Sequence, residues 1–127
     1  MSVIRNVLGT NLTPCSTNPM TGFHRDGYCN CGPEDPGQHL VCIEASDVFL
    51  DFSKARGNDL STPMPHYGFP GLKAGDRWCL CLTRWIEALK ADAAPNVVLE
   101  STHERVLSLI DLEILKKYAV DEHAQTK

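Results

Sequence analysis

The sequence contains no long apolar run. None approaches the roughly 20 residues that a helix needs to cross a bilayer, so we expect no contact with a membrane. The first residues, Met1 to Asn6, also lack a positively charged region followed by an apolar stretch, which is the pattern of a secretory signal. Together these absences predict a cytoplasmic protein.

An excess of positive charge is also missing. The chain has 12 lysines and arginines against 16 aspartates and glutamates, a formal net charge of −4. Because proteins that bind nucleic acid rely largely on basic surfaces, we expect no nucleic-acid partner. The aromatic residues could instead form a stacking surface, but packing in the core and loops is the simpler interpretation: Phe23, Tyr67, Phe69, Trp78 and Trp85.

Short motifs with a known mechanism are absent as well. The sequence has no G-x-G-x-x-G, no phosphate-binding P-loop, no H-E-x-x-H and no G-x-S-x-G nucleophile elbow. The sequence therefore offers no motif that would indicate nucleotide binding or metalloprotease activity. Whether the protein is an enzyme at all stays open at this point.

What the sequence does contain fits one domain. At 127 residues, the chain can bury a single hydrophobic core. We expect this core to span about residues 6–118 and the polar tail 119–127 to fray. Apolar runs predict strands at 40–43, 78–82 and 97–99, and apolar periodicity predicts a helix at 47–56 and another that Thr83 caps.

The last part of the chain has its own helix signals. Ser101 and Glu104 have the spacing of a capping box, which predicts a helix there, and Asp111 can cap a final helix. Long Gly/Pro-rich loops interrupt the elements, at about residues 13–37 and 57–77. We therefore predict an α+β fold, a two-layer sandwich in which three to four short helices cover a small sheet. Loops of this length usually carry function or are pinned by something.

The chain has six cysteines. In a reducing compartment they should be free thiols, whereas in an exported protein they could all pair as disulfides. Cys42, Cys79 and Cys81 have a simple interpretation as small core residues. A zinc site is the alternative, and its candidate ligands are Cys15, Cys29, Cys42, Cys79, Cys81 and His103. A reactive thiol is a third interpretation, with Cys79, Cys81 and His103 as catalytic candidates.

Charged and amide side chains gather in the long loops. Adjacent opposite charges occur at Arg25-Asp26 and at Asp76-Arg77, and Asn58-Asp59 opens the second loop. An arginine fork suits a carboxylate or a phosphate, so these residues could line a binding pocket together with Trp78. They could also simply stabilise their own turns through local hydrogen bonds.

Several blocks of residues resemble a known family. They include Met20-Thr21-Gly22-Phe23, Arg25-Asp26-Gly27, Gly57-Asn58-Asp59-Leu60, Phe69-Pro70-Gly71-Leu72 and Gly75-Asp76-Arg77-Trp78-Cys79-Leu80-Cys81. The chain is identified by them as a member of domain of unknown function 2237, an uncharacterised and mainly bacterial family, over about residues 6–118. The resemblance implies a stand-alone α+β domain and no established reaction or cofactor. Cys31 departs from the family pattern, which makes it the weakest ligand candidate.

These observations lead to one expected function and one alternative. We expect a small cytoplasmic binding or accessory domain whose loops form a polar pocket for a small anionic ligand or a partner protein. The pocket residues would be Arg25, Asp26, Asn58, Asp59, Asp76, Arg77 and Trp78. The alternative is a thiol- or metal-dependent enzyme that uses the cysteines and His103.

Overall fold

The structure is a computed structural model, and it describes residues 4–120 apart from residues 23, 33–34, 36–37 and 68. The tail that we expect to fray therefore lies almost wholly outside the described residues, as does Phe23. Within the described residues, no helix is both long enough and apolar enough to span a bilayer.

Three antiparallel strands form the sheet, in the order β2-β1-β3. They are β1 (His39–Glu44), β2 (Arg77–Cys81) and β3 (Asn96–Val97). The strands predicted at 40–43 and 78–82 are confirmed to within a few residues, because short buried apolar runs between turn residues form strands. The predicted strand at 97–99 is shorter than expected, since Leu99 already begins a 3-10 helix, η2 (Leu99–Ser101).

The α-helices begin close to where the sequence predicts. In α1 (Asp47–Ala55), the Ser46 hydroxyl accepts a hydrogen bond of 3.1 Å from the backbone N–H of Phe49, as an N-cap residue should. The helix predicted with Thr83 as its cap is α2 (Leu82–Lys90), which begins two residues earlier than that cap allows, because its N-cap position is Cys81. The last helix is α3 (Leu112–Lys116), with Asp111 at its N-cap position.

The capping box predicted at Ser101 and Glu104 is wrong. Glu104 begins a 3-10 helix, η3 (Glu104–Ser108), whose N-cap residue is His103. Ser101 cannot be that cap because it is itself the last residue of η2, and its hydroxyl donates a hydrogen bond of 3.0 Å to the carbonyl oxygen of Pro14. The capping pattern in the local sequence is thus overridden by the tertiary structure, in which Ser101 contacts the N-terminal segment.

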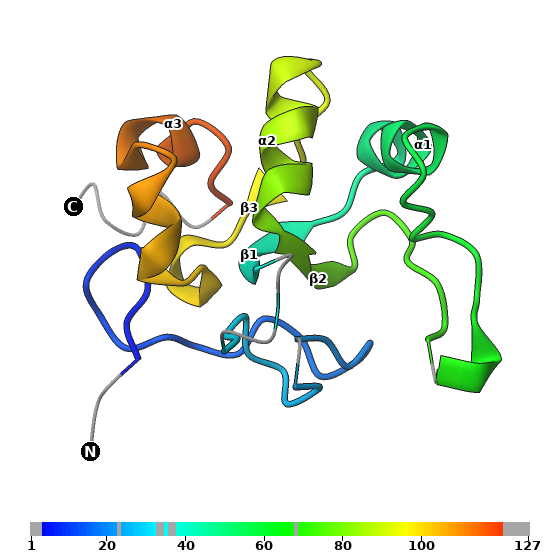
Figure 1. Ribbon diagram of the computed structural model, residues 1–127, viewed down its shortest axis with the longest axis horizontal. Coiled ribbons are helices and arrows are strands. Elements are labelled where there is room, and N and C mark those ends of the chain that lie inside the picture. The colour runs from blue at the N-terminus through cyan, green and yellow to red at the C-terminus, as the bar shows by residue number, and fades with distance from the viewer. Residues whose placement is uncertain (1–3, 23, 33–34, 36–37, 68, 121–127) are drawn as a thin grey trace.

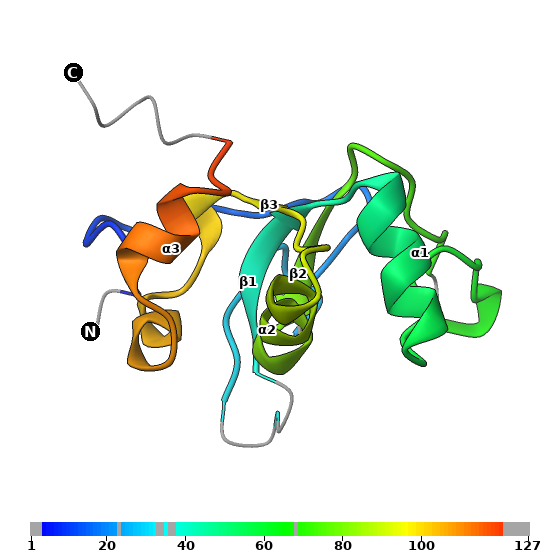
Figure 2. The same cartoon turned by 90° about the horizontal axis from the view of Figure 1, so that it is seen from above.

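The elements form layers around the sheet. Figure 1 shows the three α-helices on one side of the sheet and the N-terminal segment, in blue, on the other. Figure 2 shows α2 lying over β1 and β2, with α1 and α3 on either side of it. The main core fills the helical side, and its largest fully buried side chains include Trp85, Phe49 and Leu80. The α+β prediction is therefore confirmed.

Candidate functional site

Cys42 and Cys79 are register partners on β1 and β2. The backbone N–H of Cys42 donates to the hydroxyl of Thr102 and that of Cys79 to the hydroxyl of Thr21, so neither N–H is used between the two strands at this position. This is a non-hydrogen-bonded pair, the type in which facing side chains of antiparallel strands lie closest. The sheet therefore places two sulfur atoms next to each other on its N-terminal side.

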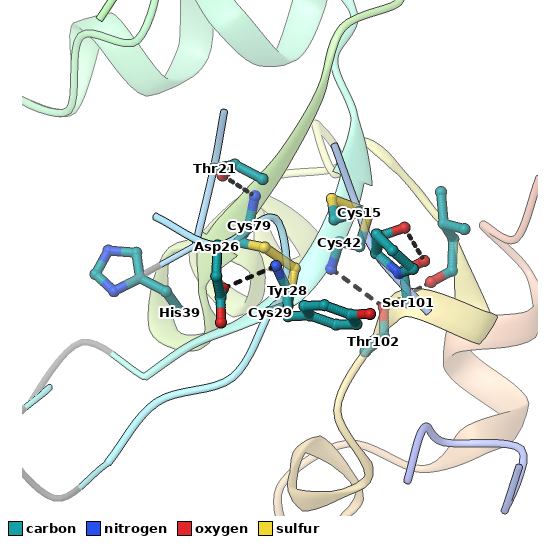
Figure 3. Close-up of a disulfide and its surroundings, with 12 residues drawn as sticks. Cys15, Thr21, Asp26, Tyr28, Cys29, His39, Cys42, Cys79, Ser101 and Thr102 are labelled. Carbon is teal, nitrogen blue, oxygen red and sulfur yellow. Dashed lines mark hydrogen bonds between the residues drawn. A yellow bond between two sulfur atoms is a disulfide. The ribbon is translucent and has the colours of Figure 1, made fainter. Parts of the chain in front are cut away.

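Each of these sulfurs is bonded to a cysteine of the N-terminal segment. The disulfides are Cys15–Cys42, with Cα atoms 5.6 Å apart, and Cys29–Cys79, with Cα atoms 5.1 Å apart. Figure 3 shows the two disulfides side by side. The structure thus differs from the expectation of free thiols for four of the six cysteines, and it follows the paired arrangement that the sequence left open.

These four cysteines form a small cluster of their own, which we call the sulfur cluster: Cys15, Cys29, Cys42 and Cys79. All four are buried, and the other buried apolar residue grouped with them is Val98. The Sγ atoms of Cys15, Cys29 and Cys79 all lie within 4.8 Å of one another. Two covalent sulfur links thus join the N-terminal segment to the sheet, beside the hydrogen bond that the Thr21 hydroxyl accepts from the N–H of Cys79.

The other three sulfur or imidazole candidates lie apart from this cluster. Cys31 is buried with the main core, and burial together with nearby Asp35 raises the pKa of its thiol. Cys81 is at the end of β2, where its sulfur is 3.3 Å from the hydroxyl of Thr83. The group of potential metal ligands found among the described residues does not include either thiol, nor His103.

His103 has a structural position. Its Nδ1 accepts a hydrogen bond of 3.0 Å from the backbone N–H of Arg105, and its own backbone N–H donates to the carbonyl of Leu40. The imidazole is buried, and this burial, assisted by Arg105, lowers its pKa. A neutral ring whose Nδ1 already accepts a hydrogen bond suits a helix cap better than a general base.

A second candidate site lies where the N-terminal segment meets the loop after α1. Its lining consists of Arg25, Asp59, Leu60, Met64, Phe69 and Trp78, around a volume of about 210 Å³, and we call it the Arg25 pocket. The Arg25 guanidinium lies over the Trp78 ring, 5.2 Å from its centroid, and Phe69 packs against the same ring edge-on at 5.0 Å. Three of the seven residues that we predicted to bind ligand meet here: Arg25, Asp59 and Trp78.

Two glycines lie close in sequence to residues that line the Arg25 pocket. Gly22 begins the turn that carries Arg25, and a Cβ atom there would lie 2.5 Å from the carbonyl oxygen of Tyr28. A Cβ atom on Gly71 would lie 2.6 Å from the carbonyl oxygen of Ser61, which follows the lining residue Leu60. Both glycines have positive φ angles, 101° and 83°. Only glycine combines this conformation with such close backbone approach.

Arg25 itself has a strained backbone, with φ of 54°. This left-handed conformation costs a residue with a side chain about 1 kcal/mol or more. Its guanidinium forms no ion pair or hydrogen bond with any residue that the structure describes. Strain of this kind concentrates at functional sites, where it sets the direction of a side chain.

Asp59 is already fully engaged by its own loop. Its carboxylate accepts hydrogen bonds from the backbone N–H and hydroxyl groups of both Ser61 and Thr62. The hydroxyl of Thr62, followed by the N–H and hydroxyl of Ser61, lowers the pKa of Asp59 to about 2. Asp59 therefore organises the pocket wall as a carboxylate bonded within its own loop, and no ion pair joins it to Arg25 among the described residues.

The structure places the remaining predicted binding residues elsewhere. Asp26 accepts a hydrogen bond from the N–H of Tyr28 and lines a separate hollow of about 250 Å³. Asp76 accepts from the N–H of Lys73 in the turn before β2, and Arg77 faces Glu44 across the strands. Asn58 is held through its backbone by Ser53, just after α1.

Sequence reasoning missed a larger hollow of about 790 Å³ beside α2. We call it the α2 groove, and it is lined by Arg56, Thr83, Arg84, Ile86, Glu87, Lys90 and Ala91. The spacing of Arg84, Glu87 and Lys90 at every third position could have indicated one polar helix face. Glu87 forms ion pairs with Arg84 at 3.2 Å and with Arg56 at 3.8 Å. Both arginines of the groove are therefore already paired with a carboxylate of the protein.

Residues 5–119 match a family model described as an uncharacterized protein conserved in bacteria (DUF2237). The chain belongs to this family. The resemblance noted over residues 6–118 is thereby confirmed, and the match covers the sulfur cluster and the Arg25 pocket alike. No curated protein matches the chain. The DUF2237 description names no reaction, so its function has to be argued from the site.

Proposed function

We propose that this DUF2237 protein is a small binding domain and that its Arg25 pocket takes a small anionic ligand. The observation that carries the proposal is the Arg25 guanidinium, which is strained in its backbone, stacked on Trp78 and unpaired among the described residues. A cation held over an aromatic ring beside a hollow is a ready partner for a carboxylate or phosphate group.

The rest of the lining narrows the ligand class. Leu60, Met64, Phe69 and Trp78 supply apolar walls, and the carboxylate of Asp59 accepts hydrogen bonds from its own loop. A volume of about 210 Å³ is small for a cofactor site. A compact molecule with one anionic group and a short apolar or aromatic body fits these walls best.

The larger α2 groove supports the proposal less well. Both of its arginines already contact Glu87, and Arg84 also donates to the carbonyl oxygen of Arg56. An anion entering there would have to compete with a carboxylate of the protein itself. The Arg25 pocket has no such competitor within hydrogen-bonding distance of its arginine among the residues described.

The enzyme alternative finds less support in the geometry. Cys79 shares its sulfur with Cys29, and the Nδ1 atom of His103 is taken by a backbone N–H. We further propose a cytoplasmic location, as the sequence suggests. Cytoplasmic disulfides are usually transient or redox-sensing, so this location predicts that the sulfur cluster changes state in the cell.

The proposal is tested by titrating the isotope-labelled protein with benzoate, acetate and inorganic phosphate and following backbone amide and indole signals by NMR. We expect the shifts to centre on the Trp78 indole and on residues 22–25 and 59–69, with benzoate giving the strongest response. Arg25→Gly should abolish them.

Arg84→Ala is the matched control, because it removes a half-buried arginine from the α2 groove and leaves the Arg25 pocket intact. It should leave the benzoate shifts unchanged. Shifts that map to Arg56, Arg84 and Lys90, or that survive Arg25→Gly, would refute an anion site at Arg25.

A further inference from the structure

We propose that Cys15, Cys29, Cys42 and Cys79 bind one zinc ion when their two disulfides are reduced. The sulfur cluster thus has two states, a bis-disulfide state and a zinc-thiolate state, and both hold the N-terminal segment against the sheet. This site is separate from the Arg25 pocket, and it holds whether or not that pocket binds an anion.

The distances suit a tetrahedral ion. A zinc–sulfur bond of about 2.3 Å puts the ligand sulfurs of a tetrahedral site about 3.8 Å apart. Three of the four sulfurs already lie within 4.8 Å of one another, and the fourth, that of Cys42, is bonded to one of them. Side-chain rotations of modest size can therefore bring all four sulfurs around one ion.

The donor set and its surroundings also favour zinc. Four cysteines make up one of the usual ligand sets of structural zinc sites, in which the ion contributes directly to folding. Two of the ligands come from facing positions on β1 and β2 and two from the N-terminal segment, so the ion would join the same parts that the disulfides join. All four side chains are at least 95% buried, which excludes competing water.

The reduced cluster needs such an ion for a physical reason. Once its sulfurs are thiols, the cluster keeps Val98 and the half-buried Val120 as its larger apolar contacts. The apolar area that this cluster buries offsets only part of the entropy of ordering the chain between Cys15 and Cys29. A metal restores the link that reduction removes.

The conversion balances with a dithiol reductant of the thioredoxin class. Two dithiols transfer four electrons and four protons to the two disulfides, giving four cysteine thiols and two oxidised reductant disulfides. Zinc then coordinates the four sulfurs as thiolates and their four protons leave to solvent.

The experiment starts from the full chain, reduced with a phosphine under nitrogen and given one equivalent of zinc or of cobalt. Each phosphine takes an oxygen atom from water and delivers two electrons and two protons to one disulfide. We expect native mass spectrometry to show one zinc per chain. We expect the cobalt form to show the intense visible bands and the sulfur-to-metal charge transfer of tetrahedral thiolate coordination.

Single serine variants locate the site. Cys29→Ser and Cys42→Ser should weaken zinc binding by more than about 100-fold, since even outer-shell partners of a metal ligand are worth about 10- to 100-fold. Cys31→Ser and Cys81→Ser are the controls and should bind zinc as the natural chain does, because these thiols lie outside the sulfur cluster.

A ligand variant that fails to fold is replaced by alkylation of the natural chain. Zinc should protect Cys15, Cys29, Cys42 and Cys79 from iodoacetamide, as read by peptide mass spectrometry, while Cys81 reacts equally with and without the ion. A reduced chain that binds neither metal overturns the proposal, as does equal alkylation of the four cysteines with and without zinc. Equal loss of zinc in the Cys81→Ser control also overturns it.

Discussion

Cys42 on β1 and Cys79 on β2 face each other across the strands, and each is bonded to a cysteine of the N-terminal segment. The residue before Cys79 on β2 is Trp78, over whose ring the same segment places Arg25. Two adjacent residues of β2 thus have different roles: Cys79 forms a disulfide with the N-terminal segment, and Trp78 lines the Arg25 pocket. The two candidate sites are therefore neighbours, joined by the N-terminal segment.

Removing a disulfide should destabilise the oxidised protein. We expect the double variants Cys15→Ser/Cys42→Ser and Cys29→Ser/Cys79→Ser each to lose about 2 to 4 kcal/mol of unfolding free energy. The second should lose about 0.5 kcal/mol more, because its disulfide spans 50 residues against 27 in the first. Urea unfolding measures both. Cys81→Ser should stay within about 0.5 kcal/mol of the natural chain, as most substitutions away from key contacts do.

The two glycines near the Arg25 pocket should not tolerate a methyl group. Gly71→Ala adds both a strained φ and a clash with the carbonyl oxygen of Ser61, so we expect a loss of more than about 2 kcal/mol. Gly57→Ala is the matched control, because its φ is also positive but nothing lies within 4 Å of the added atom. Its cost should stay near 1 kcal/mol, about the price of the conformation alone. Equal thermal unfolding of the two variants would contradict this account of Gly71.

Arg25 should be replaceable by glycine at little cost in stability. Glycine relieves a backbone strain of about 1 kcal/mol, while loss of the stacking on Trp78 costs about 0.5 to 1 kcal/mol. We expect Arg25→Gly to lie within about 1 kcal/mol of the natural chain, and Arg25→Ala to be about 1 kcal/mol less stable than Arg25→Gly. Chemical unfolding checks the order of the three. If alanine were the more stable replacement, the φ of 54° would not be a source of strain.

Stability should fall as the pH drops below about 6.5, partly through His103. The folded state lowers the pKa of this imidazole from an ordinary value of 6.5, first through burial and then through Arg105. The unfolded chain therefore takes up a proton before the folded chain does, and stability is lost as the pH falls from 6.5 through the folded pKa. His103→Asn keeps an acceptor for the N–H of Arg105 but does not titrate. Its unfolding free energy should change less between pH 7 and pH 5 than that of the natural chain.

The sequence predicts the regular elements well wherever a local signal decides them. The apolar run from Leu40 to Ile43 can only be buried, and Ser46 satisfies free N–H groups at the next helix start, so β1 and α1 follow directly. The capping box does not form, and the Ser101 hydroxyl instead donates a hydrogen bond to the carbonyl oxygen of Pro14. Nothing in the local sequence indicates this long-range contact.

The candidate sites could be predicted only as lists of residues. Pairing of Cys15 with Cys42 and of Cys29 with Cys79 depends on the register of β1 against β2, which spacing along the chain does not give. The stacking of Arg25 on Trp78 likewise joins two residues far apart in the sequence, which no local pattern indicates. Asp59 and Asp76 both hydrogen-bond within their own turns, which is the alternative that the sequence offered, and only Asp59 of the two also lines the Arg25 pocket.

The central claim is that the two disulfides hold the N-terminal segment in the position in which the Arg25 guanidinium lies over the Trp78 ring. The most direct measurement is the proton chemical shifts of the Arg25 side chain in the oxidised natural chain and in the Cys29→Ser/Cys79→Ser variant. We predict upfield shifts from the Trp78 ring in the natural chain, kept in Cys31→Ser and lost in the double variant. Arg25 protons at random-coil positions in the natural chain, or unchanged in the double variant, would contradict it.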